Sequence, residues 1–142
     1  MEKGAHLRLV FGRASKAIET IDRQSIGETG LKVTDFMILE ALLHKGPMPI
    51  NIIGEKVLLT SGSMTTAAKR LEKQGLVQRV DDPSDGRRCY LHLTKTGLSL
   101  TRNAFQAHSA TLNELFSCLT DEEQSEFIRL LKKVGTHAQT LT

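Results

Sequence analysis

The chain has 142 residues, enough for one domain with a hydrophobic core and too few for two. Lys and Arg outnumber Asp and Glu by 19 to 16, and the resulting charge of +3 is too small to indicate a polyanionic partner unless it is concentrated in one region. No apolar run approaches the roughly 20 residues that span a bilayer, and no secretory signal is recognisable, so we expect a cytoplasmic protein without membrane association.

Two helices are predicted at the start of the chain. Apolar residues recur at steps of three and four from Leu7 to Ile21, which predicts one long amphipathic helix. A second helix is predicted with Thr34 as its N-cap and with Phe36 and Leu39 facing inward. Gly46, followed by a proline, is expected to end it.

A helix-turn-helix is predicted in the centre of the chain. Residues 50–57 form a short helix in which Gly54 permits close approach of another helix. Thr60 or Ser61 then caps a second helix, which Gly75 ends by adopting the left-handed conformation. Its apolar residues fall on one side, and Ser, Thr, Lys and Arg occupy the other.

A basic hairpin and two further helices follow. Strands are predicted at 77–80 and 89–94, with the turn at 83–86. A long helix is capped by Thr94 and carries leucine and phenylalanine every seven residues from Leu98 to Leu119. This stripe suits a helix of a partner subunit, although an intramolecular core helix is an equally good interpretation. Thr120 and Glu123 form a capping box for a last helix.

The central basic region has the chemistry needed to bind double-stranded DNA. Seven Lys or Arg residues lie between positions 56 and 88. A helix fits the major groove, where hydroxyls and basic side chains reach base edges and phosphates, and an arginine beyond a hairpin turn can enter the minor groove. We expect base contacts from Ser61, Ser63, Thr65 and Thr66, phosphate contacts from Lys69, Lys73, Arg79 and Arg88, and a minor-groove contact from Arg87, with Asp85 holding Arg87 and with Arg70 also on the DNA-binding face.

These residues resemble the MarR family of winged helix-turn-helix transcriptional regulators. The most specific stretches are 71–79, LEKQGLVQR, then 82–88, DPSDGRR, and then 93–97, LTKTG. The resemblance implies a mainly α fold with a small two- to three-stranded β wing. It also implies one domain over 1–142, with a DNA-binding lobe at about 34–97 and dimerisation helices at about 5–27 and 98–141.

The same resemblance implies a function. It suggests a homodimer that binds a pseudopalindromic operator, most simply as a repressor released by a small, phenolic effector. Arg87 matches the family's wing-tip arginine, and Asp85 matches its acidic partner. Leu58 stands where many relatives have glycine, and Thr66 where many have arginine, so the base contacts are expected to differ. The effector pocket is expected to draw on the first and second helices and the start of the fifth.

Two alternatives remain from the residues alone. A thiol could sense oxidants through Cys118 or Cys89, although Cys89 alternates with leucines and is expected to be a core thiol. The winged helix could instead bind a protein. An enzyme is not indicated, since there is no phosphate loop or nucleophile elbow. The five histidines are scattered, so we expect no metal site and no cofactor.

Overall fold

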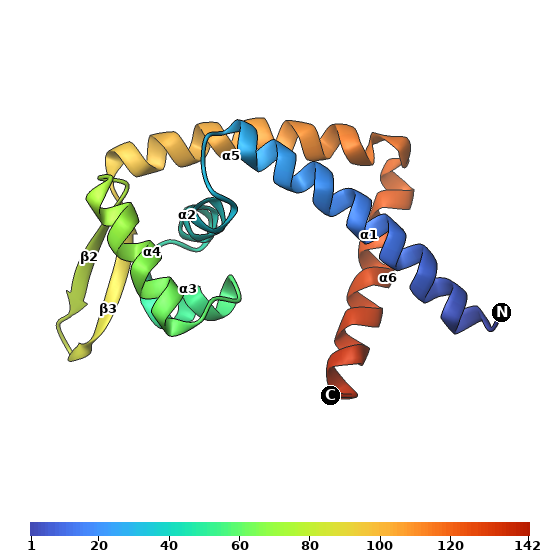
Figure 1. Ribbon diagram of the computed structural model, residues 1–142, viewed down its shortest axis with the longest axis horizontal. Coiled ribbons are helices and arrows are strands. Elements are labelled where there is room, and N and C mark those ends of the chain that lie inside the picture. Colours follow the sequence, from blue (N-terminus) through green and yellow to red (C-terminus); the bar gives the residue numbers. More distant parts are fainter. The chain divides into compact units, whose positions relative to one another are not determined.

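The computed structural model describes all 142 residues and contains six α-helices, three strands and one 3₁₀ helix (Figure 1). Two compact units, residues 1–108 and 109–142, divide the chain within α5. The predicted fold class is confirmed. No helix is both long and apolar enough to cross a membrane. The elements are α1 (Lys3–Glu28), α2 (Val33–Lys45), β1 (Met48–Pro49), α3 (Ile50–Lys56), α4 (Ser61–Lys73), β2 (Val77–Asp82), β3 (Asp85–Leu93), α5 (Lys95–Leu115), the 3₁₀ helix (Phe116–Cys118) and α6 (Asp121–Thr140).

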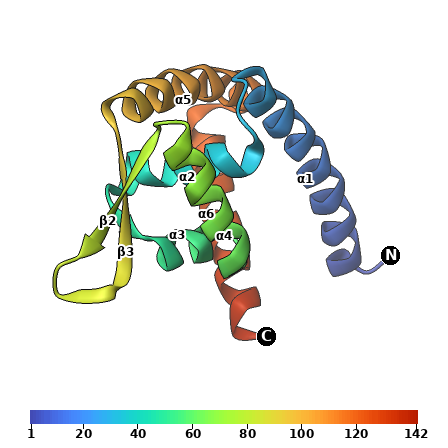
Figure 2. The ribbon, with the colours of Figure 1, turned by 60° about the vertical axis from the view of Figure 1, so that its left-hand side comes forward.

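The sheet is a three-stranded antiparallel wing in the order β1-β3-β2. Its long hairpin projects from the end of α4, as Figures 1 and 2 show. Both hairpin strands extend further than predicted, because backbone pairing continues to Asp82 and Asp85. Asp85 and Gly86 therefore belong to β3, and the turn is formed by Pro83 and Ser84.

The core of the first unit lies between α2, α3, α4 and the sheet. Its fully buried side chains come from every one of these elements, and include Leu39, Ile53, Met64, Leu71 and Leu91. A smaller cluster joins the end of α1 to α2 and α5. Because apolar burial is the main favourable term in folding, these two clusters hold α4 and the hairpin in place.

Helix ends follow the sequence in most cases. Thr60 caps α4 by accepting a hydrogen bond from the Ser63 amide at 3.2 Å, and Gly75 has a φ of 76° beyond its end. The predicted cap at Thr34 is wrong. The N-cap of α2 is Lys32, whose carbonyl accepts from the Phe36 amide at 2.9 Å, so the helix begins before Thr34.

The start of α5 is hydrogen-bonded to the residue that ends α4. Thr94 caps α5 by accepting from the Gly97 amide at 3.0 Å, and its hydroxyl also donates to the Gly75 carbonyl at 2.6 Å. A Cβ added to Gly97 would lie 1.9 Å from the carbonyl oxygen of Leu76. Only glycine allows this approach of the two backbones.

In the second unit, the 3₁₀ helix separates α5 from α6. The predicted seven-residue stripe does not reach Leu119, because α5 ends at Leu115 and Leu119 has an extended backbone. The capping box of Thr120 and Glu123 is present as predicted and starts α6. None of the side chains of α6 is buried within the chain.

Candidate nucleic-acid interface

The first turns of α4 form a small, polar and exposed surface. Ser61, Ser63, Thr65 and Thr66 are all exposed, and their contact with bases stays a prediction. The Thr65 hydroxyl donates to the Ser61 carbonyl at 2.9 Å, so Thr65 is left with acceptor capacity only. The cap at Thr60 leaves the other first-turn amides pointing outward, where they favour an anion.

The opposite face of α4 is packed against the lobe. Met64, Ala67, Ala68 and Leu71 are buried, as the helical periodicity predicted. Gly54 of α3 allows the approach, since a Cβ there would lie 3.3 Å from Cβ and Cγ of Met64. α3 and α4 are therefore held together as a helix-turn-helix (Figure 2).

The turn between α3 and α4 contains a leucine in an unusual conformation. Leu58 has a φ of 59° and is 90% exposed. The left-handed region costs a side-chain-bearing residue about 1–2 kcal/mol. The Leu58 backbone is therefore strained at the position where the family resemblance anticipated glycine.

Basic side chains continue the polar surface of α4 toward its end. Lys69 and Lys73 are exposed and available to phosphates. Arg70 differs from both, because its guanidinium is paired with the buried carboxylate of Asp35 in α2. Hydrogen bonding to Asp35 raises the pKa of Arg70 above its ordinary value. Arg70 is therefore partly exposed and ion-paired rather than free, and its predicted contact with DNA stays a prediction.

The wing carries three exposed arginines, Arg79, Arg87 and Arg88. Asp85 Oδ1 accepts from the Arg87 backbone amide at 3.0 Å and lies 3.4 Å from its Nε, so the predicted pairing is present. The Arg88 guanidinium lies 5.9 Å from the centre of the Tyr90 ring, a cation–π distance. These contacts orient two arginines at the tip of the hairpin.

The turn of the wing is held by an acidic side chain. The hydroxyl and backbone amide of Ser84 donate to Asp82 Oδ1 at 2.7 and 2.9 Å. These hydrogen bonds lower the pKa of Asp82 below the usual carboxyl range. These hydrogen bonds therefore stabilise the turn that joins β2 to the arginine-bearing strand β3.

A cavity of about 660 Å³ lies between α3, α4 and the wing. It is lined by polar and basic residues from all three, among them Asn51, Thr65, Arg79 and Arg87, and also by Cys89. Cys89 is only half-buried and belongs to neither core cluster, so the predicted core thiol is wrong. The packed face of β3 is provided by Leu91, whereas the strand end that bears Cys89 extends beyond the core.

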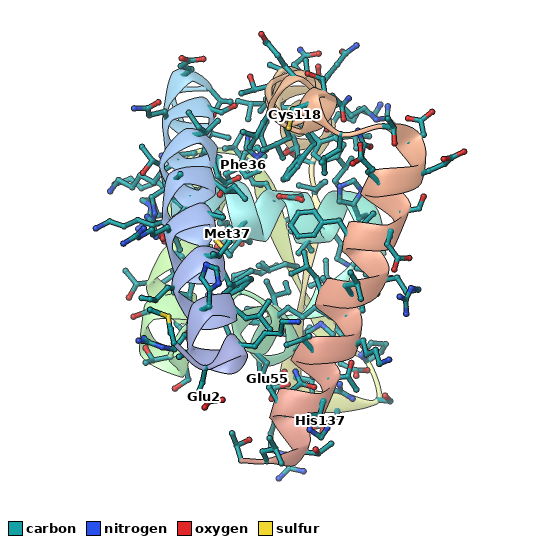
Figure 3. All side chains as sticks on the ribbon, turned by 90° about the vertical axis from the view of Figure 1, so that its right-hand side faces the viewer. Glu2, Phe36, Met37, Glu55, Cys118 and His137 are labelled. Carbon is teal, nitrogen blue, oxygen red and sulfur yellow. The ribbon has the colours of Figure 1, made fainter.

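The other cysteine belongs to the second unit. Cys118 is exposed in the 3₁₀ helix at the end of α5 (Figure 3), and its thiol donates weakly to the Leu115 carbonyl at 3.8 Å. No group of three or more His, Cys, Asp or Glu side chains is arranged to hold a metal ion.

A buried polar cluster joins α1 to α5 in the first unit. His108 Nδ1 lies 2.9 Å from the Ser25 hydroxyl, and its Nε2 lies 3.0 Å from Asp22 Oδ1. Phe36 meets the imidazole edge-to-face, with the ring centres 5.0 Å apart. The sequence analysis did not find this cluster, because its members lie up to 86 residues apart.

Ser25 also lines a cavity of about 940 Å³ between the end of α1 and the first half of α5. Its polar lining includes Glu28, Thr29, Lys95 and Asn103. The expected effector pocket drew on α1, α2 and α5, but no α2 residue lines this cavity.

Comparisons with known proteins agree with this geometry. The sequence profile of the MarR family matches residues 31–89. The chain is 37% identical over 138 residues to the HTH-type transcriptional regulator MhqR of Bacillus subtilis, an alignment that covers 97% of this chain and 95% of MhqR. That profile match includes α4 and most of the wing.

Two similar solved structures carry ligands. Reduced AbfR bound to DNA has 25% identity and a TM-score of 0.72, with 97% of this chain and 93% of AbfR covered. PcaV of Streptomyces coelicolor in complex with its natural ligand has 25% identity and a TM-score of 0.74, with 89% of this chain and 92% of PcaV covered. The chain belongs to the MarR family of DNA-binding transcriptional regulators, as the motif at 71–97 indicated.

Proposed function

We propose that this regulator binds a pseudopalindromic operator as a homodimer and represses transcription until a small phenolic effector releases it. The observation that carries the proposal is the exposed face of α4 beside the arginine-bearing wing. Hydroxyls at Ser61, Ser63, Thr65 and Thr66 suit base edges. The cations of Lys69, Lys73, Arg79 and Arg88 suit phosphates, and Arg87 suits the minor groove.

Support for a homodimer comes from uncovered apolar side chains. α1 exposes Leu7, Val10 and Phe11, and α6 exposes Ile128, Leu130, Leu131 and Val134. Apolar sets of this size on a monomer mark an interface. A second copy of the chain would also supply the second half-site reader, about one turn of DNA away from the first.

Operator binding is tested by selecting fragments of the source genome with the purified protein at two salt concentrations. We expect an enriched inverted repeat whose binding weakens as salt rises, because bound phosphates release counterions. Arg87→Ala should weaken binding to that repeat by about 1–3 kcal/mol. Unchanged affinity in the variant would remove the wing from the mechanism, and no enriched sequence would contradict operator recognition.

Repression is tested with a reporter gene placed behind the enriched repeat. Expression should fall when the protein is present and should recover with an active effector. Activation by the protein would reverse the sign of the proposal and leave its DNA-binding part standing.

The cavity between α1 and α5 supports release by a small molecule. Its volume of about 940 Å³ lies within the usual range for ligand pockets, and hydroxyls, an amide and the Lys95 amine surround apolar surface. A phenol would pair its ring with the apolar part and its hydroxyl with the polar groups. The similar regulator PcaV has been solved in complex with its natural ligand, which supports a ligand-responsive regulator here.

Effector binding is tested by the shift in melting temperature with phenol, hydroquinone and 4-hydroxybenzoate. A binding compound should raise the melting temperature and lower operator affinity. Ala107→Phe, which fills the cavity, should abolish the shift, whereas Ala110→Phe, outside the lining, should keep it. A shift that survives Ala107→Phe would place the effector elsewhere.

A thiol-sensing regulator is a second candidate, favoured by the exposure of Cys118 and the half-exposure of Cys89. Peroxide or quinone treatment should then weaken operator binding, and Cys118→Ser or Cys89→Ser should remove that response. If both single variants and the double variant lost operator binding on oxidation as readily as the wild type, a thiol sensor would be excluded.

A further inference from the structure

An ion pair joins α2 to α4 beside the DNA-binding face. Arg70 Nη2 donates to Oδ1 of Asp35, and Arg70 Nε lies 3.4 Å from Oδ2, so the guanidinium engages both carboxylate oxygens. The Asp35 side chain is 5% exposed and that of Arg70 is 32% exposed. Asp35 lies in the first turn of α2, where the helix dipole also favours its negative charge.

The other contacts of α4 with the lobe are mostly apolar. Its buried face consists of Met64, Leu71 and the alanines at 67 and 68. Apolar burial is non-directional, and one further directional contact of α4 is the Glu72 carboxylate, which accepts from a backbone amide of the wing at 3.2 Å. A forked guanidinium–carboxylate pair has a fixed plane and direction, so it adds a directional restraint on the rotation of the helix.

The rotation of α4 decides where its hydroxyls point. Arg70 follows Thr66 by one helical turn, and these two side chains line one cavity of about 590 Å³ together with Ser63. Residues four apart lie on the same face of a helix, so rotation about the helix axis turns both side chains in the same direction. A change at Arg70 would therefore displace the hydroxyls expected to contact bases.

We propose that Asp35 is a positioning residue for DNA recognition: it holds Arg70, and through Arg70 it sets the rotation of α4. Arg70 then acts inside the lobe and contacts no phosphate. The inference rests on the proposed operator binding and deepens it, because it assigns part of the sequence discrimination to a residue outside the DNA-binding face.

The two possible roles of Arg70 predict opposite effects of Asp35→Asn. If Arg70 contacted a phosphate, removal of the acid would free a cation and tighten binding. If Asp35 positions α4, the variant should bind the enriched duplex about tenfold more weakly, the effect of breaking a coupled pair. Glu55→Gln, which removes an exposed acid beside the other cavity of this face, is the control and should bind slightly more tightly.

A second variant separates charge from fork geometry. Arg70→Lys keeps the positive charge but cannot engage both carboxylate oxygens. If Asp35 positions α4 through Arg70, the Arg70→Lys variant should lose affinity for the enriched duplex but keep its affinity for a scrambled duplex. The slope of log affinity against log salt concentration should not change. Lys69→Gln should instead weaken both duplexes and reduce that slope by about one. Wild-type affinity and discrimination in Arg70→Lys would overturn the proposal, as would tighter binding in Asp35→Asn.

Hydrogen exchange tests the positioning without DNA. In folded Asp35→Asn and Arg70→Lys, verified by circular dichroism, amides of α4 should exchange faster than in the wild type, and those of α6 should not change. If the wild-type protein enriched no DNA sequence, the operator-binding proposal would fail independently of the positioning role. Faster exchange in the variants would then still support the positioning of α4 by Asp35 and Arg70, whereas unchanged exchange in both variants would overturn that positioning.

Discussion

α4 and α6 are both amphipathic helices, but only α4 has its apolar face covered by its own chain. The apolar residues of α4, Met64 and Leu71 among them, are 0–2% exposed. None of the residues of α6 is buried, and Val134 is 67% exposed. The same amphipathic pattern therefore has two different roles. The apolar face of α4 holds that helix in the lobe, whereas the apolar face of α6 is available to another molecule.

The largest loss of stability in the packed region is expected from a substitution at the junction of α4 and α5. In Gly97→Ala the new methyl group would meet the Leu76 carbonyl at 1.9 Å, and backbone must move. Overpacking of this kind should lower the free energy of unfolding by about 3 kcal/mol. Urea denaturation measures it.

Gly135→Ala in α6 is the matched control. Its added methyl has nothing within 4 Å, so higher helix propensity should stabilise the chain by up to about 1 kcal/mol. Similar effects of the two substitutions would remove the contrast between the helices.

The open face of α6 can be tested with one charge. Val134→Asp should dissociate the proposed dimer, because an unpaired carboxylate at a buried interface costs several kcal/mol. Light scattering after gel filtration measures the mass. Thr136→Asp, on the opposite side of the helix by periodicity, should keep the wild-type mass. A wild-type mass in Val134→Asp would show that this face has another use.

A smaller effect is expected in the turn before α4. Leu58→Gly should raise the free energy of unfolding by about 0.5–1 kcal/mol, because relief of the left-handed strain exceeds the added entropy of the unfolded chain. Thermal denaturation provides the comparison. The same change at Lys56, which is helical, should be destabilising. Destabilisation in both would mean that Leu58 contributes contacts of its own.

Much of the fold was predictable from short-range patterns. The caps at Thr94 and Thr120, the left-handed Gly75 and the buried face of α4 were predicted and are present, and of the two caps considered for α4 the structure has Thr60. Each depends on residues within a few positions of one another. Local hydrogen bonding and helical periodicity therefore determine them.

The sequence by itself also determined the exposed polar face of α4, because its hydroxyls and cations recur at helical spacing. Tertiary structure decided what the pattern could not. Asp35 and Arg70 are 35 positions apart, and His108 is 83 from Ser25, so only the packing of helices brings them together. Cys89 shows the same limit, since alternation along a strand gives its side but not where the core ends. Periodicity determines which side of a helix or strand a side chain lies on. Its contacts and its burial depend on the neighbouring helices and strands.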